Sequence, residues 1–225
     1  MSERALIDVV MVTNGKRMEL LKQSVDSLLN NSKDIDSFQL TVVHDGALGN
    51  RTGDINIFVD EYVGASRCRN IGASSVPKYR RGQYVMFVDD DVYMCPGWDE
   101  RLLEAMSHLH PIVSGHAHPY NHTVLESYPR VYRTTVLSTV HMFMAWETWD
   151  EIGWFTEPGG PGGSEDVDWC KRADNLGFNL YVTKPHCVIH AGLTNSKGEK
   201  IVGYEQMVKQ NTELIKHYRI PVQQQ

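Results

Sequence analysis

Three consecutive aspartates, Asp89–Asp91, directly follow the apolar run 84–88. Such a run is typical of a strand that is buried on both faces. Carboxylates grouped at its end would repel one another and lose hydration, so a cation is expected beside them. Mg²⁺ and Mn²⁺ prefer oxygen ligands, and Mg²⁺ usually takes one or two carboxylates plus substrate phosphates. An acidic turn in solvent or a helix cap before Pro96 is the alternative, which the buried strand disfavours.

Side chains alternate along an extended chain, so Asp89 and Asp91 should point the same way. We therefore expect these two acids to serve one metal ion or its nucleotide. Asp90 is expected to face elsewhere, and its loss to be the best tolerated of the three.

A second acidic pair, Glu165 and Asp166, follows the glycine-rich segment 157–163. In one interpretation Ser164 caps a helix, and the two acids complement the helix dipole. In the other, the pair supplies a general base, because a carboxylate at a helix N-terminus stays ionised at neutral pH. The residues alone do not decide between the two.

Histidines and arginines supply further candidates. His190 ends an apolar run and is either a third metal ligand through its neutral imidazole or a buried histidine bonded to the backbone. A zinc site at His116, His118 and His122 is disfavoured, because no acid or cysteine completes a known ligand spacing. Arg67 and Arg69 either meet phosphate or the aspartates, or lie on the surface.

The elements that would position these groups alternate between strand and helix. Residues 6–12, 40–43, 55–59 and 83–88 have strand patterns, and residues 16–30, 64–75 and 99–109 have helical ones. This order predicts a mostly parallel sheet with helices on both faces. Ligands bind such sheets outside the carboxyl ends of the strands. Thr13, Asp45 and the three aspartates each follow a strand, so they should share one edge.

The second half is less regular. A strand is expected at 112–114, an irregular stretch at 116–132, a helix at 164–176 ended by Gly177, strands at 178–183 and 187–190, and a docked helix at 203–218. The apolar segment 136–149 is either an acceptor platform or, in the favoured interpretation, core.

Length, composition, net charge and cysteine pattern indicate the general class of protein. The chain has 225 residues, 41% hydrophobic and 22% charged, which fits one folded α/β domain. A net charge of −6 gives no overall basic surface for nucleic acid. Its four cysteines are scattered without a C-x-x-C pair, which favours free thiols. With neither a signal-peptide pattern nor a membrane-length apolar window, a cytoplasmic location is expected.

Several segments in this order resemble the GT-A glycosyltransferases, family 2-like. In the first half they are 10–15, 42–46, 64–72 and 84–91; in the second half they are 153–155, 162–169 and Pro185 to His190. The resemblance implies one GT-A domain over residues 1–225, a three-layer α/β/α sandwich around a Rossmann-like sheet. Residues 1 to about 110 would bind the nucleotide sugar, and about 111 to 225 would bind the acceptor and supply the base.

The resemblance also implies roles for single residues. Thr13 and Asp45 would hold the nucleobase and ribose, and Arg69 and Asp90 would lie at the donor nucleotide. Asp89 and Asp91 match the D-x-D acids, with His190 completing a Mn²⁺ or Mg²⁺ site. Asp166, beside Glu165, matches the catalytic base of inverting members, and Trp154 and Gly163 match the acceptor side. The sequence departs from the family at His44, which replaces a commoner acid, at Ala47, where relatives carry a serine, and at Ser164, which interrupts a G-G-E-D pattern.

The expected activity is therefore metal-dependent transfer of a hexose or pentose from a nucleotide-diphosphate sugar, most simply a UDP-sugar, with inversion. The acceptor hydroxyl could belong to a glycan, a small molecule, a protein or a nucleic acid. Two alternatives stay open. One is a nucleotidyltransferase, which has a similar sheet but usually carries a glycine- and lysine-rich phosphate loop near the N-terminus. Residues 14–17 resemble such a loop only weakly. The other alternative is a non-catalytic nucleotide-sugar-binding module.

Overall fold

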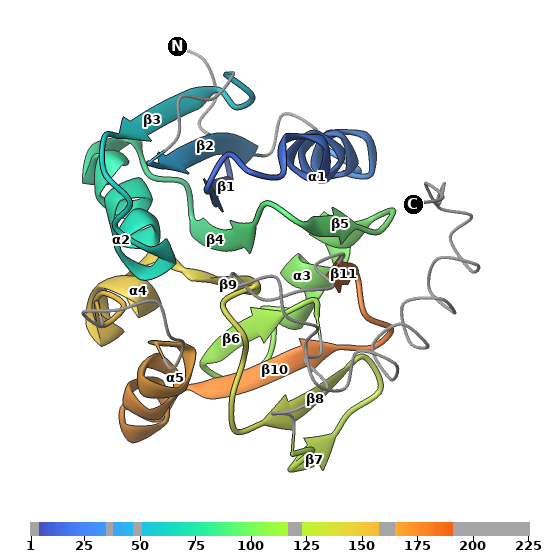
Figure 1. The fold of residues 1–225 in the computed structure, drawn as a ribbon. Helices are drawn as coiled ribbons and strands as arrows, with labels where there is room; N and C mark the ends of the chain where they lie inside the picture. Colours follow the sequence, from blue (N-terminus) through green and yellow to red (C-terminus); the bar gives the residue numbers. More distant parts are fainter. Residues whose placement is uncertain (1–4, 35–37, 47–50, 117–122, 158–164, 191–225) are drawn as a thin grey trace.

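The computed structural model describes residues 5–34, 38–46, 51–116, 123–157 and 165–190 (Figure 1). The strands are β1 (Ile7–Thr13), β2 (Phe38–Asp45), β3 (Ile55–Val59), β4 (Tyr84–Asp89), β5 (Val92–Met94), β6 (Pro111–Ser114), β7 (Glu126–Ser127), β8 (Val131–Thr134), β9 (His141–Ala145), β10 (Asn179–Thr183) and β11 (Val188–His190). The helices are α1 (Met18–Asn30), α2 (Ala65–Ser75), α3 (Trp98–Ala105), α4 (Trp146–Ile152) and α5 (Glu165–Asn175), with a 3-10 turn at Lys78–Arg80. In these ranges nine strands form one sheet, in the order β3-β2-β1-β4-β9-β6-β10-β8-β7, and β5 pairs with β11 separately.

The strands of the first half are parallel. β3, β2, β1 and β4 lie side by side, and every residue of β1 is buried, as in a strand covered on both faces. In the register, Thr13 lies opposite His44 of β2, and Val12 lies opposite Asp89 of β4. The carboxyl ends of β1, β2 and β4 therefore meet at one edge of the sheet. This confirms the shared edge predicted for Thr13, Asp45 and the aspartates.

The second half continues the same sheet. β9 pairs antiparallel with both β4 and β6, β10 runs parallel to β6, and β8 and β7 add antiparallel strands at the edge. The predicted α/β fold with a parallel Rossmann-like centre is confirmed, and antiparallel pairs enter only beyond β4. The stretch expected to be irregular, 116–132, contains β7 and the start of β8, and β5 was not predicted. The helix expected at 203–218 lies outside the described residues.

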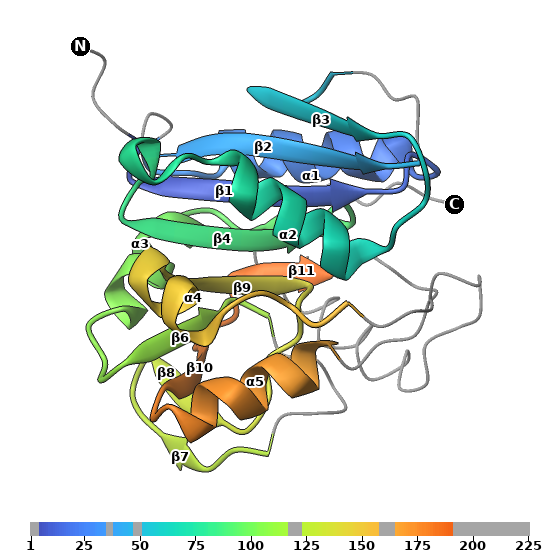
Figure 2. The ribbon, with the colours of Figure 1, turned by 90° about the vertical axis from the view of Figure 1, so that its left-hand side faces the viewer.

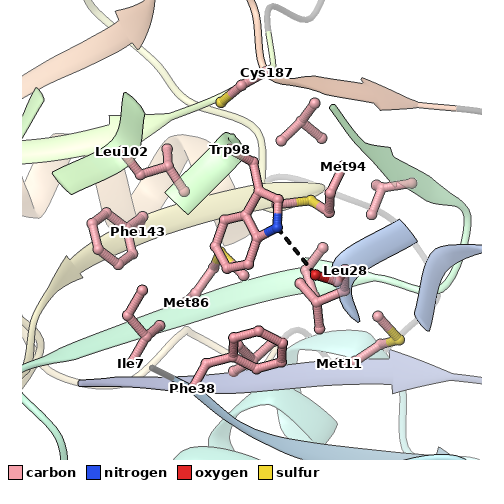
Figure 3. Close-up of a cluster of buried hydrophobic side chains, with 14 of the residues drawn as sticks. Ile7, Met11, Leu28, Phe38, Met86, Met94, Trp98, Leu102, Phe143 and Cys187 are labelled. Carbon is pink, nitrogen blue, oxygen red and sulfur yellow. Dashed lines mark hydrogen bonds between the residues drawn. The ribbon is translucent and has the colours of Figure 1, made fainter. Parts of the chain in front are cut away.

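Helices cover both faces of the sheet. α2, α4 and α5 pack on one face, which is turned toward the viewer in Figure 2, and α1 and α3 pack on the other. Figure 3 shows the core under α1 and α3, where the ring centroid of Trp98 lies 5.7 Å from that of Phe38. Its indole Nε1 donates to the main-chain oxygen of Leu28 at 3.2 Å, which ties α3 to the end of α1.

The apolar segment 136–149 is core, as favoured from the sequence. It forms β9 and α4, and five of its large side chains are each 3% exposed or less: Met142, Phe143, Met144, Trp146 and Trp149. Trp149 packs between Phe87 of β4 and Trp169 of α5, with ring centroids 4.7 and 6.0 Å away. The segment thereby fixes α5 against the sheet.

The helix predicted at 99–109 is shorter than expected: it ends at Ala105, and Leu109 beyond it is exposed. After Ala105 the main-chain amides of Ser107 and His108 bond to carbonyls three residues back, so the last turn tightens. The chain must reverse there to enter β6 at Pro111. Within the described part of the chain, every helix is too short or too polar to cross a bilayer.

Candidate active site

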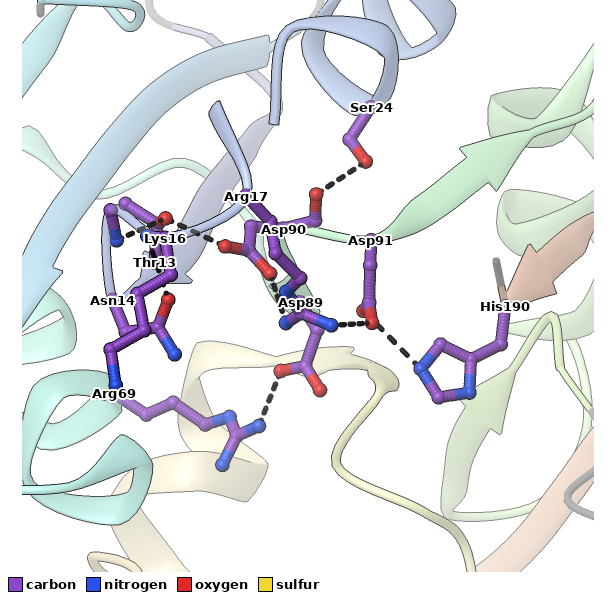
Figure 4. A network of polar contacts seen from close by, with 11 residues as sticks. Thr13, Asn14, Lys16, Arg17, Ser24, Arg69, Asp89, Asp90, Asp91 and His190 are labelled. Atoms are coloured by element: carbon purple, nitrogen blue, oxygen red, sulfur yellow. Dashed lines mark hydrogen bonds and ion pairs between the residues drawn. The ribbon is translucent and has the colours of Figure 1, made fainter. Parts of the chain in front are cut away.

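Asp90 lies at the centre of a polar network at the carboxyl edge of the sheet (Figure 4). It is 1% exposed and accepts hydrogen bonds from Thr13 Oγ1 and Arg17 Nη2, both at 2.6 Å. Ser24 Oγ of α1 donates to its main-chain oxygen at 2.9 Å. Burial raises the pKa of Asp90 to about 6, although Arg17 and Thr13 oppose the shift. Asp90 faces Thr13 and shares Arg17 with Asp91, whereas Asp89 is held by Arg69, so strand alternation does not describe the three side chains beyond the end of β4 at Asp89.

Asp91 is contacted by a guanidinium and an imidazole. Arg17 Nη1 donates to Oδ2, and His190 Nε2 lies 3.2 Å from Oδ1. His190 reaches this position because β11 pairs with β5, which places it opposite Val92. Burial acts to raise the pKa of Asp91, but His190 and Arg17 outweigh it and lower the pKa. Burial likewise acts to lower the pKa of His190, and the contact with Asp91 raises it.

Arg69 joins the two halves of the chain. It lies on α2 and is 2% exposed, so the alternative of a surface arginine is wrong for this residue, whereas Arg67 is 57% exposed. Its Nη2 donates to Asp89 Oδ1, and its Nη1 lies 3.4 Å from Glu165 Oε1. Burial acts to lower the pKa of Arg69, and the two carboxylates raise it. Asp89 and Glu165, 76 residues apart in sequence, are therefore held by one guanidinium.

Glu165 and Asp166 form the first turn of α5, as both interpretations of the sequence required. Glu165 Oε1 also accepts from Thr139 Oγ1 at 3.2 Å, whereas Asp166 Oδ1 accepts from the main-chain amide of Val167. Burial raises the pKa of Asp166, and the neighbouring Glu165 raises it further. Gly177, with φ of +85°, follows the end of the helix as predicted. Ser164 and Gly163 lie outside the described residues.

Asp45 has a structural task at the same edge. Its Oδ1 accepts from the amide of Val63 at 2.7 Å and its Oδ2 from that of Gly64 at 2.9 Å, so it holds the turn that begins α2. His44, the departure from the family pattern, stacks on Phe58 with ring centroids 4.5 Å apart. Burial lowers its pKa, which favours the neutral ring.

The predicted metal ligands have suitable chemistry but form no preformed cage. Two carboxylates, Asp89 and Asp91, and the imidazole of His190 are donors that Mn²⁺ accepts. Across the described ranges, no three His, Cys, Asp or Glu side chains converge closely enough to hold a metal ion by themselves. The ring of His116 lies 5.7 Å from that of His190, and His118 and His122 lie outside the described residues.

Sequence reasoning missed three polar residues of this site. Arg17 lies in the loop after β1, the segment 14–17 that resembles a phosphate-binding loop only weakly. Its position four residues after the end of a strand could have indicated that it lies at the carboxyl edge of the sheet. Ser24 and Thr139 carried no signal, because their partners lie 66 and 26 residues away in sequence.

Trp154, the predicted acceptor residue, is 59% exposed. Its main-chain oxygen accepts from Arg172 Nη2 of α5 at 2.7 Å, which fixes the segment that follows α4. A hollow of about 600 Å³ lies elsewhere, lined by residues of α3 and by Tyr128, Arg130 and Lys184. Arg130 pairs there with Glu104, and Arg133 pairs with Glu126, so the positive charges beside this hollow are offset.

Solved structures with the same fold are glycosyltransferases of low sequence identity. The chain is similar to GalNAc-T7 with UDP, GalNAc and Mn²⁺ (TM-score 0.68, 14% identity, 93% of this chain and 48% of that one). It is similar to S. aureus TarS 1–349 (TM-score 0.58, 17% identity, 78% of this chain and 57% of that one). It is also similar to mannosyltransferase PcManGT from Pyrobaculum calidifontis in complex with GDP-Man and Mn²⁺ (TM-score 0.57, 12% identity, 80% of this chain and 57% of that one). The chain thus spans about half the length of the first of these. Comparison with curated protein sequences gives no significant match.

The family model of glycosyl transferase family 2 matches residues 8–169. That range includes the strand ends, the three aspartates, Arg69 and the Glu165–Asp166 pair, and His190 lies beyond it. With the fold shared by the solved glycosyltransferases, the match extends over most of the chain. This protein belongs to glycosyl transferase family 2 and has the GT-A fold.

Proposed function

We propose that this chain transfers a sugar from a nucleotide-diphosphate donor to an acceptor hydroxyl, with a divalent cation and with inversion. The observation that carries the proposal is the bridge by Arg69, which holds Asp89 at the donor edge and Glu165 at the start of α5. It draws the end of β4 and the first turn of α5 into one site. The halves before and after about residue 110 would then supply donor binding and catalysis respectively.

The donor end of the site is assigned to the strand edge. Thr13, Asp45 and Asp90 would face the nucleoside, and Asp89, Asp91 and His190 would hold Mn²⁺ or Mg²⁺. A divalent ion bound there would neutralise negative charge that develops on the departing diphosphate. Mn²⁺ accompanies UDP in one similar structure and GDP-Man in another, which supports Mn²⁺ and a nucleotide sugar as first probes. UDP-sugars are the first donors to test.

Asp166 is the better candidate for the base. Glu165 is hydrogen-bonded to Arg69 and Thr139, whereas Asp166 accepts from the main-chain amide of Val167. A raised pKa brings a carboxylate closer to the operating pH, which improves general-base catalysis. Asp166 would take the proton of the acceptor hydroxyl as its oxygen attacks the anomeric carbon and the bond to the diphosphate oxygen breaks. This produces inversion in one displacement.

The exposed indole of Trp154 is proposed as an acceptor contact, because aromatic faces present apolar area to sugars and bases. Gly163 would lie on the same side. The acceptor class itself stays open between glycan, small molecule, protein and nucleic acid. The four buried free thiols support the proposed reducing, cytoplasmic compartment.

The test is a screen of nucleotide sugars by thermal shift with Mn²⁺, followed by mass spectrometry of products and NMR of the anomeric centre. Asp91→Ala should abolish metal-dependent turnover, and Asp166→Asn should lower kcat by about 10²–10⁴-fold. Asp150→Asn, at an exposed carboxylate paired with Lys78 and Arg81, is the control. Full activity of Asp91→Ala would refute the assignment. Pyrophosphate release from a nucleoside triphosphate would indicate a nucleotidyltransferase, and donor binding without turnover a binding module.

A further inference from the structure

Arg17 holds both carboxylates of the acidic turn at once. Its Nη2 donates to Asp90 Oδ1 at 2.6 Å and its Nη1 donates to Asp91 Oδ2 (Figure 4). The two acids are 1% and 3% exposed, whereas the Arg17 side chain is 36% exposed. The guanidinium therefore lies on the solvent side of two buried acids, where it can leave without opening the core.

Arg17 and a divalent ion would compete for the same carboxylate. Asp91 is assigned to the metal in the proposed function, and its Oδ2 is already occupied by Arg17. A guanidinium and a divalent ion at one carboxylate repel each other strongly, since both are cations at short range. Arg69 cannot make way in the same manner, because it is 2% exposed and is enclosed by Asp89, Glu165 and the ring of Phe155.

A displaced Arg17 would be stabilised by another anion. It is the residue before α1, so its main chain is fixed at the start of that helix while its side chain is free to turn outward. The helix dipole disfavours a cation at this end, so an anion beside the guanidinium stabilises it. A diphosphate offers oxygens in the geometry that guanidinium groups bind in pairs.

We propose that Arg17 is the internal counter-ion of Asp90 and Asp91 and exchanges these acids for the donor diphosphate when the divalent ion binds. The inference rests on the proposed function, because it uses the metal and diphosphate assigned there. Arg17 would then be a positioning residue that couples metal binding to nucleotide binding. Mn²⁺ alone would bind weakly, since it must displace a cation, and Mn²⁺ with the nucleotide would bind well, since the released cation gains a partner.

The experiment measures Mn²⁺ binding by electron paramagnetic resonance, with and without UDP, for the wild type, Arg17→Met and Lys16→Met. Met keeps much of the side-chain length without the charge, and Lys16 is an exposed neighbouring cation whose loss changes the net charge equally. Without UDP, Arg17→Met should bind Mn²⁺ about 10-fold more tightly than the wild type, and UDP should improve its Mn²⁺ affinity less. Lys16→Met should behave as the wild type.

Equal or weaker Mn²⁺ binding by Arg17→Met without UDP, together with unchanged coupling, would overturn the exchange while leaving the metal site intact. If no protein binds Mn²⁺ with or without UDP, the metal assignment of the proposed function fails, and the exchange fails with it. Arg17→Lys guards against a misfolded Met variant. A single ammonium cannot hold both acids as the guanidinium does, so this variant should bind Mn²⁺ more tightly than the wild type, and a wild-type affinity would overturn the exchange.

Discussion

Replacing Arg69 with methionine removes the guanidinium that joins Asp89 to Glu165 and leaves both carboxylates without that partner. Breaking a fully buried ion pair in this way costs about 3–5 kcal/mol. The Asp89 side chain is 26% exposed and that of Glu165 is 13% exposed, so water reaches both in part. We therefore expect the free energy of unfolding to fall by about 2–4 kcal/mol. For a chain of this size, that corresponds to a Tm lower by roughly 6–12 °C.

The assay is urea unfolding at pH 7.5, with Arg67→Met as the matched control. Arg67 lies on the same helix, is 57% exposed and is 3.9 Å from Glu157, so its loss should cost less than about 1 kcal/mol. A loss for Arg69→Met below 1 kcal/mol, or equal to that of the control, would refute the view that this bridge organises the site.

The pH dependence gives a second check. Burial raises the folded-state pKa of Asp89 even with Arg69 present, so this carboxyl group takes up its proton at a higher pH in the folded protein than in the unfolded chain. Removing Arg69 raises that pKa further. The stability lost on removing Arg69 should be fully present above the folded-state pKa of Asp89 in the variant. It should shrink as pH falls below that value, because Asp89 is then protonated, first in the variant and at lower pH in both proteins. A difference independent of pH between 7.5 and 5 would contradict this account.

Three other outcomes are expected. Asp8→Ala removes the acceptor of two hydrogen bonds, from Trp146 Nε1 and from the Gly82 amide, both at 2.7 Å. Urea unfolding should show a free energy of unfolding lower by about 2–4 kcal/mol, and a loss below about 1 kcal/mol would contradict the importance of these two bonds. Gly72→Ala would place Cβ 2.3 Å from Val10 Cγ1 and should lower the free energy of unfolding by about 1–3 kcal/mol. The control Ser74→Ala, at an exposed position on the same helix, should change it by less than about 0.5 kcal/mol. Equal effects of the two variants would argue against close packing of α2 on β1. The four buried thiols should not react with a thiol reagent at pH 8 until the protein is denatured: Cys68, Cys95, Cys170 and Cys187. Burial raises the pKa of Cys187 to about 11 and the pKa of each of the other three to about 12. Reaction of more than one thiol in the native protein would refute this.

Much of the fold follows from local pattern. The runs at 9–12 and 84–88 are apolar without alternation, which predicts burial on both faces and hence a parallel strand between helix layers. The second half was less regular in pattern: the strand predicted at 187–190 is confirmed as β11, whereas β7 has two residues and no periodicity to read. In the first half, the three-residue β5 was not predicted for the same reason. α3 ends early for a reason of tertiary geometry, because the chain must turn into β6.

The sequence by itself determined that Thr13, Asp45 and the three aspartates would meet at one edge, because parallel strands bring their carboxyl ends together. Only the tertiary structure decided how those groups are paired. Arg17 meets Asp90 across 73 residues and Arg69 meets Glu165 across 96, and no local pattern encodes such distances. Asp90 is central for the same reason. Strand alternation describes an extended chain, whereas the turn after β4 is shaped by α1 and the loop before it, which reach the aspartates only once the layers pack.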